Sequence, residues 1–214
     1  MKRNTMDFIK LGLLLCLICI LAAGLLTILY SVTRERIEIQ HQREIKESLP
    51  LVLPNAKSFS SMKHMDDIDY YEGLSDNFEV IGYALNGHTH GYQSMIEFII
   101  GIDTKGNIKG LRILEQGETP GLGARITEIK SDESLWSFIK SFFVSSHHSK
   151  GKSIEPWFTA MFRGKEYSTL SVCKTGETHN AVEAITGATI TSVAVADGVK
   201  NTITTFLQKV TAEK

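Results

Sequence analysis

The chain has 214 residues, of which 43% are hydrophobic and 22% charged, and its formal net charge is −1. This length and composition are sufficient for one domain with a hydrophobic core and an additional segment. The near-neutral charge provides no global basic field of the kind that nucleic-acid-binding proteins carry, so we expect no nucleic-acid partner.

An uncharged run from Leu11 to Tyr30 predicts a transmembrane helix near the N-terminus. At 1.5 Å per residue such a helix spans roughly 30 Å, the thickness of a bilayer's hydrocarbon core. The alternative is a cleaved signal peptide, but Ala22 and Ala23 lie within the run and more leucines follow them. We therefore expect residues 1–32 to form an uncleaved anchor. Basic residues flank the run on both sides, and export of the following domain is the simpler topology.

Residues 33–50 are polar and typical of a helix that continues away from the membrane. Ile37, Ile45 and Leu49 give this segment an apolar edge, and Pro50 is expected to end it. We expect a membrane-proximal stalk helix that packs on one folded domain, which comprises residues 51–214.

The first part of this domain is rich in short β-type runs. Residues 78–87 and 94–103 flank the connection GHTHGY, and residues 107–116 follow the turn TKGN. Alternating apolar residues separated by such turn signals predict an antiparallel meander.

The second part of the domain mixes helical and strand patterns. Residues 131–143 predict an amphipathic helix, and residues 166–176 predict another strand. From Ser192 to Val210, apolar residues recur at the helical period and predict a C-terminal helix. We therefore expect an α+β fold: a single N-terminal transmembrane helix followed by one α+β domain with an antiparallel sheet.

Hydroxyl residues crowd the stretch ITGATITS, just before the C-terminal helix. They are Thr186, Thr189, Thr191 and Ser192, placed around the small residues Gly187 and Ala188. Thr191 or Ser192 is a natural N-cap for the helix. A helix N-terminus also attracts phosphate, and Gly187 and Ala188 would leave room for one within reach of Thr189. Spacing alone favours capping and excludes neither interpretation.

The segment GETPGLGARI is a second unusual stretch. Pro120-Gly121 is a strong turn signal, and Gly121 and Gly123 permit backbone conformations that other residues avoid. A tight connector explains the glycines but not the residue types at Glu118, Thr119 and Leu122. Between two glycines, Leu122 is expected to be displayed on the surface.

Other candidate sites in the sequence are weaker. His88, His90 and the pair at 147–148 lack further ligands, so we expect loop histidines and no metal site. The segment SKGKS lacks the first glycine of a phosphate-binding loop. An aromatic cluster indicates either core packing or a pocket for a flat ring; its members are Trp157, Phe158, Met161 and Phe162. We find no candidate catalytic acid or base.

These motifs give the chain a resemblance to a known family. The N-terminal anchor, GIDTKGNIKGLRILEQGETPGLGARI and EAITGATITSVAVADGV resemble the FMN-binding domain of membrane redox pumps. The sequence is most similar to the G subunit of Rnf-type electron-transport complexes. The C subunit of the Na⁺-translocating NADH:quinone reductase is related to it. The resemblance covers nearly the whole chain.

The resemblance implies a covalent cofactor. In this family the last threonine of the Ser/Thr-Gly-Ala-Thr motif, here Thr189, is esterified to the phosphate of FMN by a dedicated flavin transferase. An acidic residue, most often Asp, precedes the motif by three positions, and Glu183 stands there. The family's Glu-Thr-Pro-Gly-Leu-Gly loop corresponds to residues 118–123, and Thr119 and Leu122 are expected beside the isoalloxazine ring.

The resemblance therefore implies a membrane-anchored flavoprotein subunit. It would relay electrons within an Rnf-type complex that couples electron transfer between ferredoxin and NAD to ion translocation. Other membrane subunits and the flavin transferase would be its partners. Its domain would lie on the outer side of the cytoplasmic membrane. Two alternatives remain open: a quinone-reductase-type subunit or stand-alone flavin carrier, and a tethered ligand-binding or sensory module.

Overall fold

The computed structural model describes residues 2–65, 68–129, 155–173 and 180–212. By its internal contacts the chain divides into two units, Met1–Glu44 and Ile45–Lys214, and each is described by itself. The expected amphipathic helix at 131–143, the segment SKGKS and the histidines at 147–148 lie outside the described residues.

Helix α1 (Lys2–Val52) contains the whole uncharged run. Among the described residues, α1 is the one helix that is long enough and apolar enough to cross a membrane. Its hydroxyl groups bond within the helix: Thr27 Oγ1 donates to the carbonyl of Ala23, and Thr33 Oγ1 donates to that of Leu29, each at 2.8 Å. A bilayer requires such internal satisfaction of polar groups, so the segment suits a membrane.

The prediction that Pro50 ends this helix is wrong, because α1 continues to Val52. Proline removes one backbone donor, but the helix resumes its bonding when Leu53 N–H donates to the Leu49 carbonyl at 3.0 Å. Leu49 and Val52 are buried in the core of the second unit. Burial of two large apolar side chains stabilises the last turn by about 3 kcal/mol or more, enough to offset the proline.

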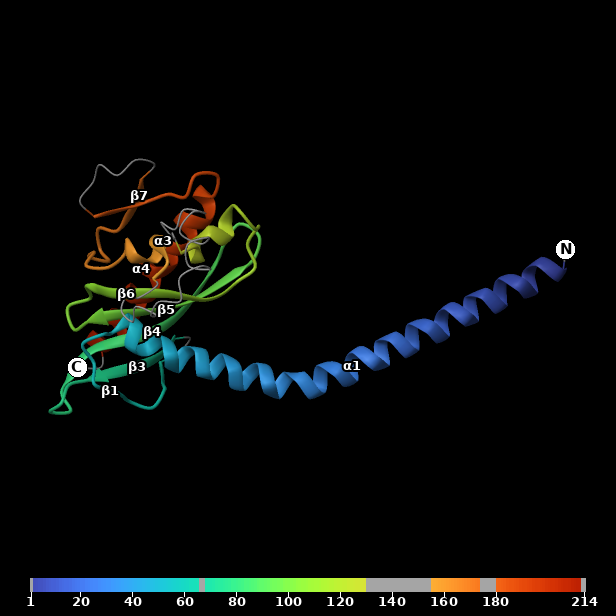
Figure 1. The fold of residues 1–214 in the computed structure, drawn as a ribbon, viewed down its shortest axis with the longest axis horizontal. Coiled ribbons are helices and arrows are strands. Elements are labelled where there is room, and N and C mark those ends of the chain that lie inside the picture. Colours follow the sequence, from blue (N-terminus) through green and yellow to red (C-terminus); the bar gives the residue numbers. More distant parts are fainter. Residues whose placement is uncertain (1, 66–67, 130–154, 174–179, 213–214) are drawn as a thin grey trace, which may run out of the picture. The chain divides into compact units, whose positions relative to one another are not determined.

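The sheet of the second unit is built as the predicted antiparallel meander (Figure 1). Its strand order is β1-β3-β4-β5-β6, with β2 paired to β3. The strands are β1 (Ser58–Phe59), β2 (Lys63–Met65), β3 (Ile68–Leu74), β4 (Val80–His90), β5 (Met95–Asp103) and β6 (Ile108–Gln116).

Strand β4 is longer than expected. His88 and His90 lie within it, paired with Glu97 and Met95 of β5, and not at the tip of the hairpin. Thr89 between them donates a hydrogen bond to the carbonyl of Ala194 at 3.1 Å. This tertiary contact and the cross-strand pairs extend the ladder through residues whose sequence reads as a turn.

Side chains alternate between the two faces of the sheet, and each face has its own core. On one face Leu85, Phe98 and Ile100 pack with residues of the C-terminal helix. On the other face Ala84 and Ile99 pack with Leu49 at the end of α1. The central strands are covered on both faces, which explains the nearly continuous apolar run in β5.

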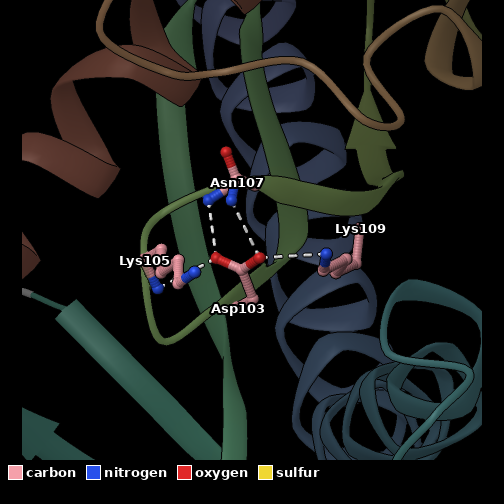
Figure 2. Close-up of polar contacts among 4 residues, drawn as sticks. All are labelled: Asp103, Lys105, Asn107 and Lys109. Carbon is pink, nitrogen blue, oxygen red and sulfur yellow. Dashed lines mark hydrogen bonds and ion pairs between the residues drawn. The ribbon is translucent and has the colours of Figure 1, made fainter.

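The turn between β5 and β6 is held by one carboxylate (Figure 2). Asp103 Oδ1 accepts the backbone N–H groups of Lys105 and Asn107, at 2.9 and 2.8 Å. Its Oδ2 accepts from the Asn107 side-chain amide and the Lys109 ammonium, each at 2.9 Å. The turn signal TKGN is therefore completed by the residue that precedes it.

Short elements follow the sheet. The 3₁₀ helix η1 (Gly123–Thr127) continues from the glycine-rich loop. Helix α3 (Trp157–Ala160) carries Trp157 and Phe158 of the aromatic cluster, and Met161 and Phe162 follow directly after it. Phe158 and Phe162 are fully buried, so the core interpretation of this cluster is confirmed. Of the strand predicted at 166–176, the described residues form a strand only at β7 (Ser171–Cys173), which pairs in parallel with β8 (Ala181–Glu183).

The C-terminal helix α4 (Thr189–Ala212) begins three residues before the expected start at Ser192. Its predicted apolar stripe faces the core: Val195, Val199, Ile203 and Phe206 are fully buried, and Val210, the last member, is partly buried against the same core. The helix packs against β4, where Gly198 and Thr89 meet so closely that a Cβ on Gly198 would lie 2.7 Å from the Thr89 Cβ.

Candidate functional site

A cavity of about 410 Å³ lies where the hairpin turn after β4, the glycine-rich loop and the start of α4 meet. Small-molecule sites commonly have this size. Its lining residues are Tyr92, Glu118, Thr119, Leu122, Gly123, Gly187, Ala188, Thr189, Ile190 and Thr191. Another cavity, of about 290 Å³ beside Leu51 and Arg112, is lined by none of the predicted site residues.

The cavity brings together most of the predicted site residues, although the two motifs are far apart in sequence. Three predicted residues do not line it: Gly121, Thr186 and Ser192. Two lining residues were not predicted, Tyr92 and Ile190. The hairpin turn that carries Tyr92 has no motif that would distinguish it from an ordinary polar turn, so sequence reasoning had no signal for it.

Glu118 lines the cavity where the three segments meet. Its carboxylate is buried, with 5% of the residue exposed, and accepts hydrogen bonds from protein groups. The backbone N–H groups of Gln93 and Ser94 donate to Oε1 at 2.9 and 3.0 Å, and the Thr191 hydroxyl donates to Oε2 at 2.7 Å. Burial raises the pKa of the Glu118 carboxyl, but these bonds lower it by more, so its pKa lies below the ordinary value.

The prediction that Thr191 or Ser192 caps α4 is wrong, because both lie inside its first turn. Ser192 N–H donates to the Ala188 carbonyl at 3.0 Å, which makes Ala188 the residue at the cap position. Ser192 Oγ donates to the same carbonyl and accepts the N–H of Ile185, each at 3.0 Å. The Thr191 hydroxyl is taken by Glu118. Both hydroxyls therefore bond to neighbouring segments and cap no N–H group of their own helix.

Thr189 occupies a different environment. It is the first residue of α4, is exposed, and lies on the cavity wall. The N–H groups of a helix's first turn have no partner within the helix, and they carry the positive end of the helix dipole. A hydroxyl and an anion-attracting helix terminus therefore coincide at one point of the cavity.

Two glycines near the cavity have backbone conformations that favour glycine. Gly121 has φ +76° and Gly187 has φ +83°. A Cβ on Gly187 would lie 3.1 Å from Cδ2 of Leu122, so the leucine side chain reaches across to the second motif. Leu122 remains 46% exposed, which confirms that it is displayed. An exposed leucine on a cavity wall suits the face of a flat apolar ring.

Thr119 and Thr186 differ in their surroundings. Thr119 Oγ1 donates to Oε1 of Gln93 at 2.8 Å, a further link between the glycine-rich loop and the hairpin turn. Thr186 is exposed beside Gly187.

In the described part of the chain, no group of three or more His, Cys, Asp or Glu side chains is placed to hold a metal ion.

Two known protein families match this chain. The FMN-binding domain family matches residues 91–204, which include both motifs and the cavity, and the RnfG N-terminal region matches residues 1–51. The first match alone covers more than half of the chain.

Whole-length relatives agree with these matches. The chain is 31% identical over 213 residues to the G subunit of the Na⁺-translocating ferredoxin:NAD⁺ oxidoreductase complex of Acetobacterium woodii, covering 92% of this chain and 90% of that protein. It is 28% identical over 210 residues to the G subunit of the ion-translocating oxidoreductase complex of Methanosarcina acetivorans, covering 94% and 95%.

A solved structure is also similar: the C subunit of the Na⁺-translocating NADH-quinone reductase of Parabacteroides distasonis, at 25% identity and TM-score 0.45. The likeness covers 65% of this chain and 61% of that one. From the family matches and the Acetobacterium relative, the chain belongs to the G subunits of Rnf-type ion-translocating oxidoreductase complexes, which carry an FMN-binding domain.

Proposed function

We propose that this chain is an electron carrier whose FMN is attached through a phosphoester to Thr189. The proposal rests on the different environments of the hydroxyl groups at the start of α4. Thr191 and Ser192 are buried and hydrogen-bonded inside the protein, whereas Thr189 is exposed on the wall of the cavity. Of these three, Thr189 is therefore the hydroxyl that a modifying enzyme can reach.

In the attachment step Thr189 Oγ would form a bond to the flavin-bearing phosphorus of a flavin phosphoanhydride held by the transferase, while the P–O bond to the second phosphate breaks. That second phosphate group leaves and takes up the hydroxyl proton, so the chain gains the mass of FMN less one water. Partial positive charge at the first turn of α4 favours the phosphate that remains beside it. Gly187 has no side chain, and a Cβ at this position would lie 3.1 Å from Cδ2 of Leu122, so a larger residue would crowd the loop that faces Thr189.

The remaining site residues would hold and shield the ring. We propose that Leu122 packs against the isoalloxazine face and that Thr119 lies beside it, with Gly121 and Gly123 shaping the loop. Bound FMN supplies the electron chemistry, and the protein supplies orientation, exclusion of water and electrostatics. A covalent bond would prevent loss of the cofactor from a domain with an open cavity.

We further propose that the chain works together with the other membrane subunits of an Rnf-type complex. This complex would transfer electrons between ferredoxin and NAD. The chain is anchored by α1, and the domain lies on the outer side of the cytoplasmic membrane, where a flavin transferase would act. Fusions of alkaline phosphatase and green fluorescent protein to the C-terminus test this topology. An active phosphatase and a dark fluorescent protein are expected, and the reverse result would overturn it.

The attachment is tested by the intact mass of the full chain, made together with a flavin transferase and purified in detergent. The expected mass is that of the chain with FMN less one water, and the denatured band should fluoresce on a gel. Thr189→Ala should abolish both signals. Thr205→Ala is the matched control, because it removes an exposed hydroxyl of the same helix that does not line the cavity, and it should leave both signals unchanged.

Three results would contradict the proposal. The first is fluorescence that survives Thr189→Ala, the second is loss of the signal in the Thr205→Ala control, and the third is an unmodified wild-type mass. Attached flavin that cannot be reversibly reduced would instead favour a ligand-binding or sensory module.

A further inference from the structure

Three segments that are far apart in sequence meet at the carboxylate of Glu118. The hairpin turn after β4 contributes the backbone N–H groups of residues 92–94, at 3.3, 2.9 and 3.0 Å. The start of α4 contributes the Thr191 hydroxyl at 2.7 Å. Glu118 itself belongs to the glycine-rich loop. Its carboxylate therefore holds together the three walls of the cavity.

Two glycines leave room for this carboxylate. A Cβ on Gly91 would lie 2.5 Å from Oε1 of Glu118, and a Cβ on Gly123 would lie 2.5 Å from Oε2. Any side chain at either position would displace the carboxylate from its donors. The loop glycine at 123 thus serves the approach of Glu118 to its partners, a role that turn geometry alone does not require.

The hydrogen bonds to Glu118 also keep it ionised at neutral pH. A carboxylate that accepts several N–H and O–H bonds is stabilised in its charged form, even when it is buried. Because Glu118 lines the cavity, a fixed negative charge lies at the wall of the site. Reduction of a flavin adds electrons to its ring, and a nearby buried negative charge makes that addition less favourable.

We infer that Glu118 is a positioning residue of the FMN site with a second, electrostatic role. It holds the start of α4 against the glycine-rich loop so that Thr189 faces the cavity, and its charge lowers the reduction potential of the flavin held there. This inference rests on the proposed attachment to Thr189.

Three variants of the full chain separate geometry from charge, each made with a flavin transferase and purified in detergent. Glu118→Gln keeps the size of the side chain and removes its charge. Thr191→Val keeps the shape of the threonine and removes the hydroxyl bond, but leaves the carboxylate charged. Glu115→Gln, the matched control, removes the charge of an exposed glutamate on β6.

The readouts are the fraction of chains that carry FMN, from intact mass, and the midpoint potential of the attached flavin, from spectrophotometric redox titration. In Glu118→Gln a smaller fraction of chains should carry FMN, and the FMN that is attached should have a less negative midpoint potential. In Thr191→Val a smaller fraction of chains should also carry FMN, but the attached FMN should keep the wild-type potential. Glu115→Gln should match the wild-type chain in both.

Wild-type values in Glu118→Gln would overturn the inference, as would an equal potential shift in Thr191→Val. Circular dichroism checks that each variant folds; if Glu118→Gln does not fold, wild-type attachment in Thr191→Val would overturn the inference. A wild-type chain without FMN would overturn the proposed function together with the inference. FMN on the wild-type chain with unchanged values in Glu118→Gln would overturn the inference alone.

Discussion

The hydroxyl of Thr191 donates a 2.7 Å hydrogen bond to Oε2 of Glu118, although 73 residues separate the two in sequence. Each residue belongs to one of the two motifs that the sequence singles out. The bond explains why a glutamate opens the glycine-rich loop, a choice that its turn geometry leaves unexplained. It also commits the Thr191 hydroxyl to a structural role and leaves Thr189 exposed at the cavity.

Gly123→Ala should destabilise the domain because its Cβ would lie 2.5 Å from Glu118 Oε2 and 2.9 Å from Thr191 Oγ1. Overpacking of this kind costs about 1–3 kcal/mol. Chemical unfolding of the full chain in detergent measures the loss.

Gly121→Asn provides the comparison for that loss. Gly121 has a left-handed φ of +76° but open space around its Cβ position, and asparagine tolerates this conformation better than most residues. Its cost should therefore stay below that of Gly123→Ala. A larger loss of unfolding free energy in Gly121→Asn than in Gly123→Ala would show that the backbone conformation at Gly121, and not the space for Glu118, limits the stability of the loop.

Leu122→Asn should leave the free energy of unfolding within about 0.5 kcal/mol of wild type, because the side chain is 46% exposed. If Leu122 covers the flavin ring as proposed, the visible absorption of the attached flavin should shift toward that of FMN in water. Ile129→Asn alters a side chain of similar exposure, 48%, that does not line the cavity. Equal spectra for the two variants would argue against contact between Leu122 and the ring.

Gly198→Ala sets helix propensity against packing. Alanine in place of glycine favours a helix interior by about 1 kcal/mol. The new Cβ would lie 2.7 Å from the Cβ of Thr89, which is held in β4 and bonded to the Ala194 carbonyl. Thr89 is fixed by this bond and by its strand, so the clash should outweigh the propensity gain, with a net loss of up to about 2 kcal/mol.

Asp197→Ala tests this balance at the neighbouring position of α4. Asp197 is exposed, so alanine there should change the free energy of unfolding by less than about 0.5 kcal/mol. A stabilised Gly198→Ala chain would mean that α4 and β4 separate more easily than their contact distance indicates.

Local patterns in the sequence were sufficient for the long elements α1, β4, β5, β6 and α4, but they identified none of the strands β1, β2, β3 and β8 individually. The uncharged run predicts α1, the turn signals predict β4, β5 and β6, and the apolar stripe from Val195 to Phe206 predicts the buried face of α4. Each of these rests on periodicity within one segment, which the chain encodes without reference to distant residues. Pro50 and the histidines of β4 depart from local expectation because tertiary packing outweighs propensity there.

The site was only partly predictable for the opposite reason. The motifs identified the cavity walls, but nothing local to Thr191 indicates that its hydroxyl bonds to Glu118 and not to its own helix. The same is true of Tyr92, which reaches the cavity through the hairpin turn. Contacts between distant segments determine which hydroxyl is hydrogen-bonded inside the protein and which is exposed. A single sequence does not show such contacts as a local pattern.

Asp103 should make a measurable contribution to stability above pH 4. Burial raises the pKa of its carboxyl, but the hydrogen bonds from Asn107, Lys109 and Lys105 shown in Figure 2 lower it by more, from 3.8 to about 2. A folded-state pKa below the unfolded value means that the stabilisation is present above the unfolded pKa. It is lost as the pH falls from about 4 to about 2, and the shift corresponds to about 2 kcal/mol.

Asp103→Asn removes this charge and should destabilise the chain at pH 7 by about 1–2 kcal/mol. Glu118 also has a lowered pKa, so both chains should lose stability in acid. The difference between wild type and Asp103→Asn isolates Asp103, and it should shrink toward zero between about pH 4 and pH 2. Chemical unfolding across this range gives the difference directly. A difference that stays constant with pH would mean that the turn depends on the shape of the Asp103 side chain and not on its charge.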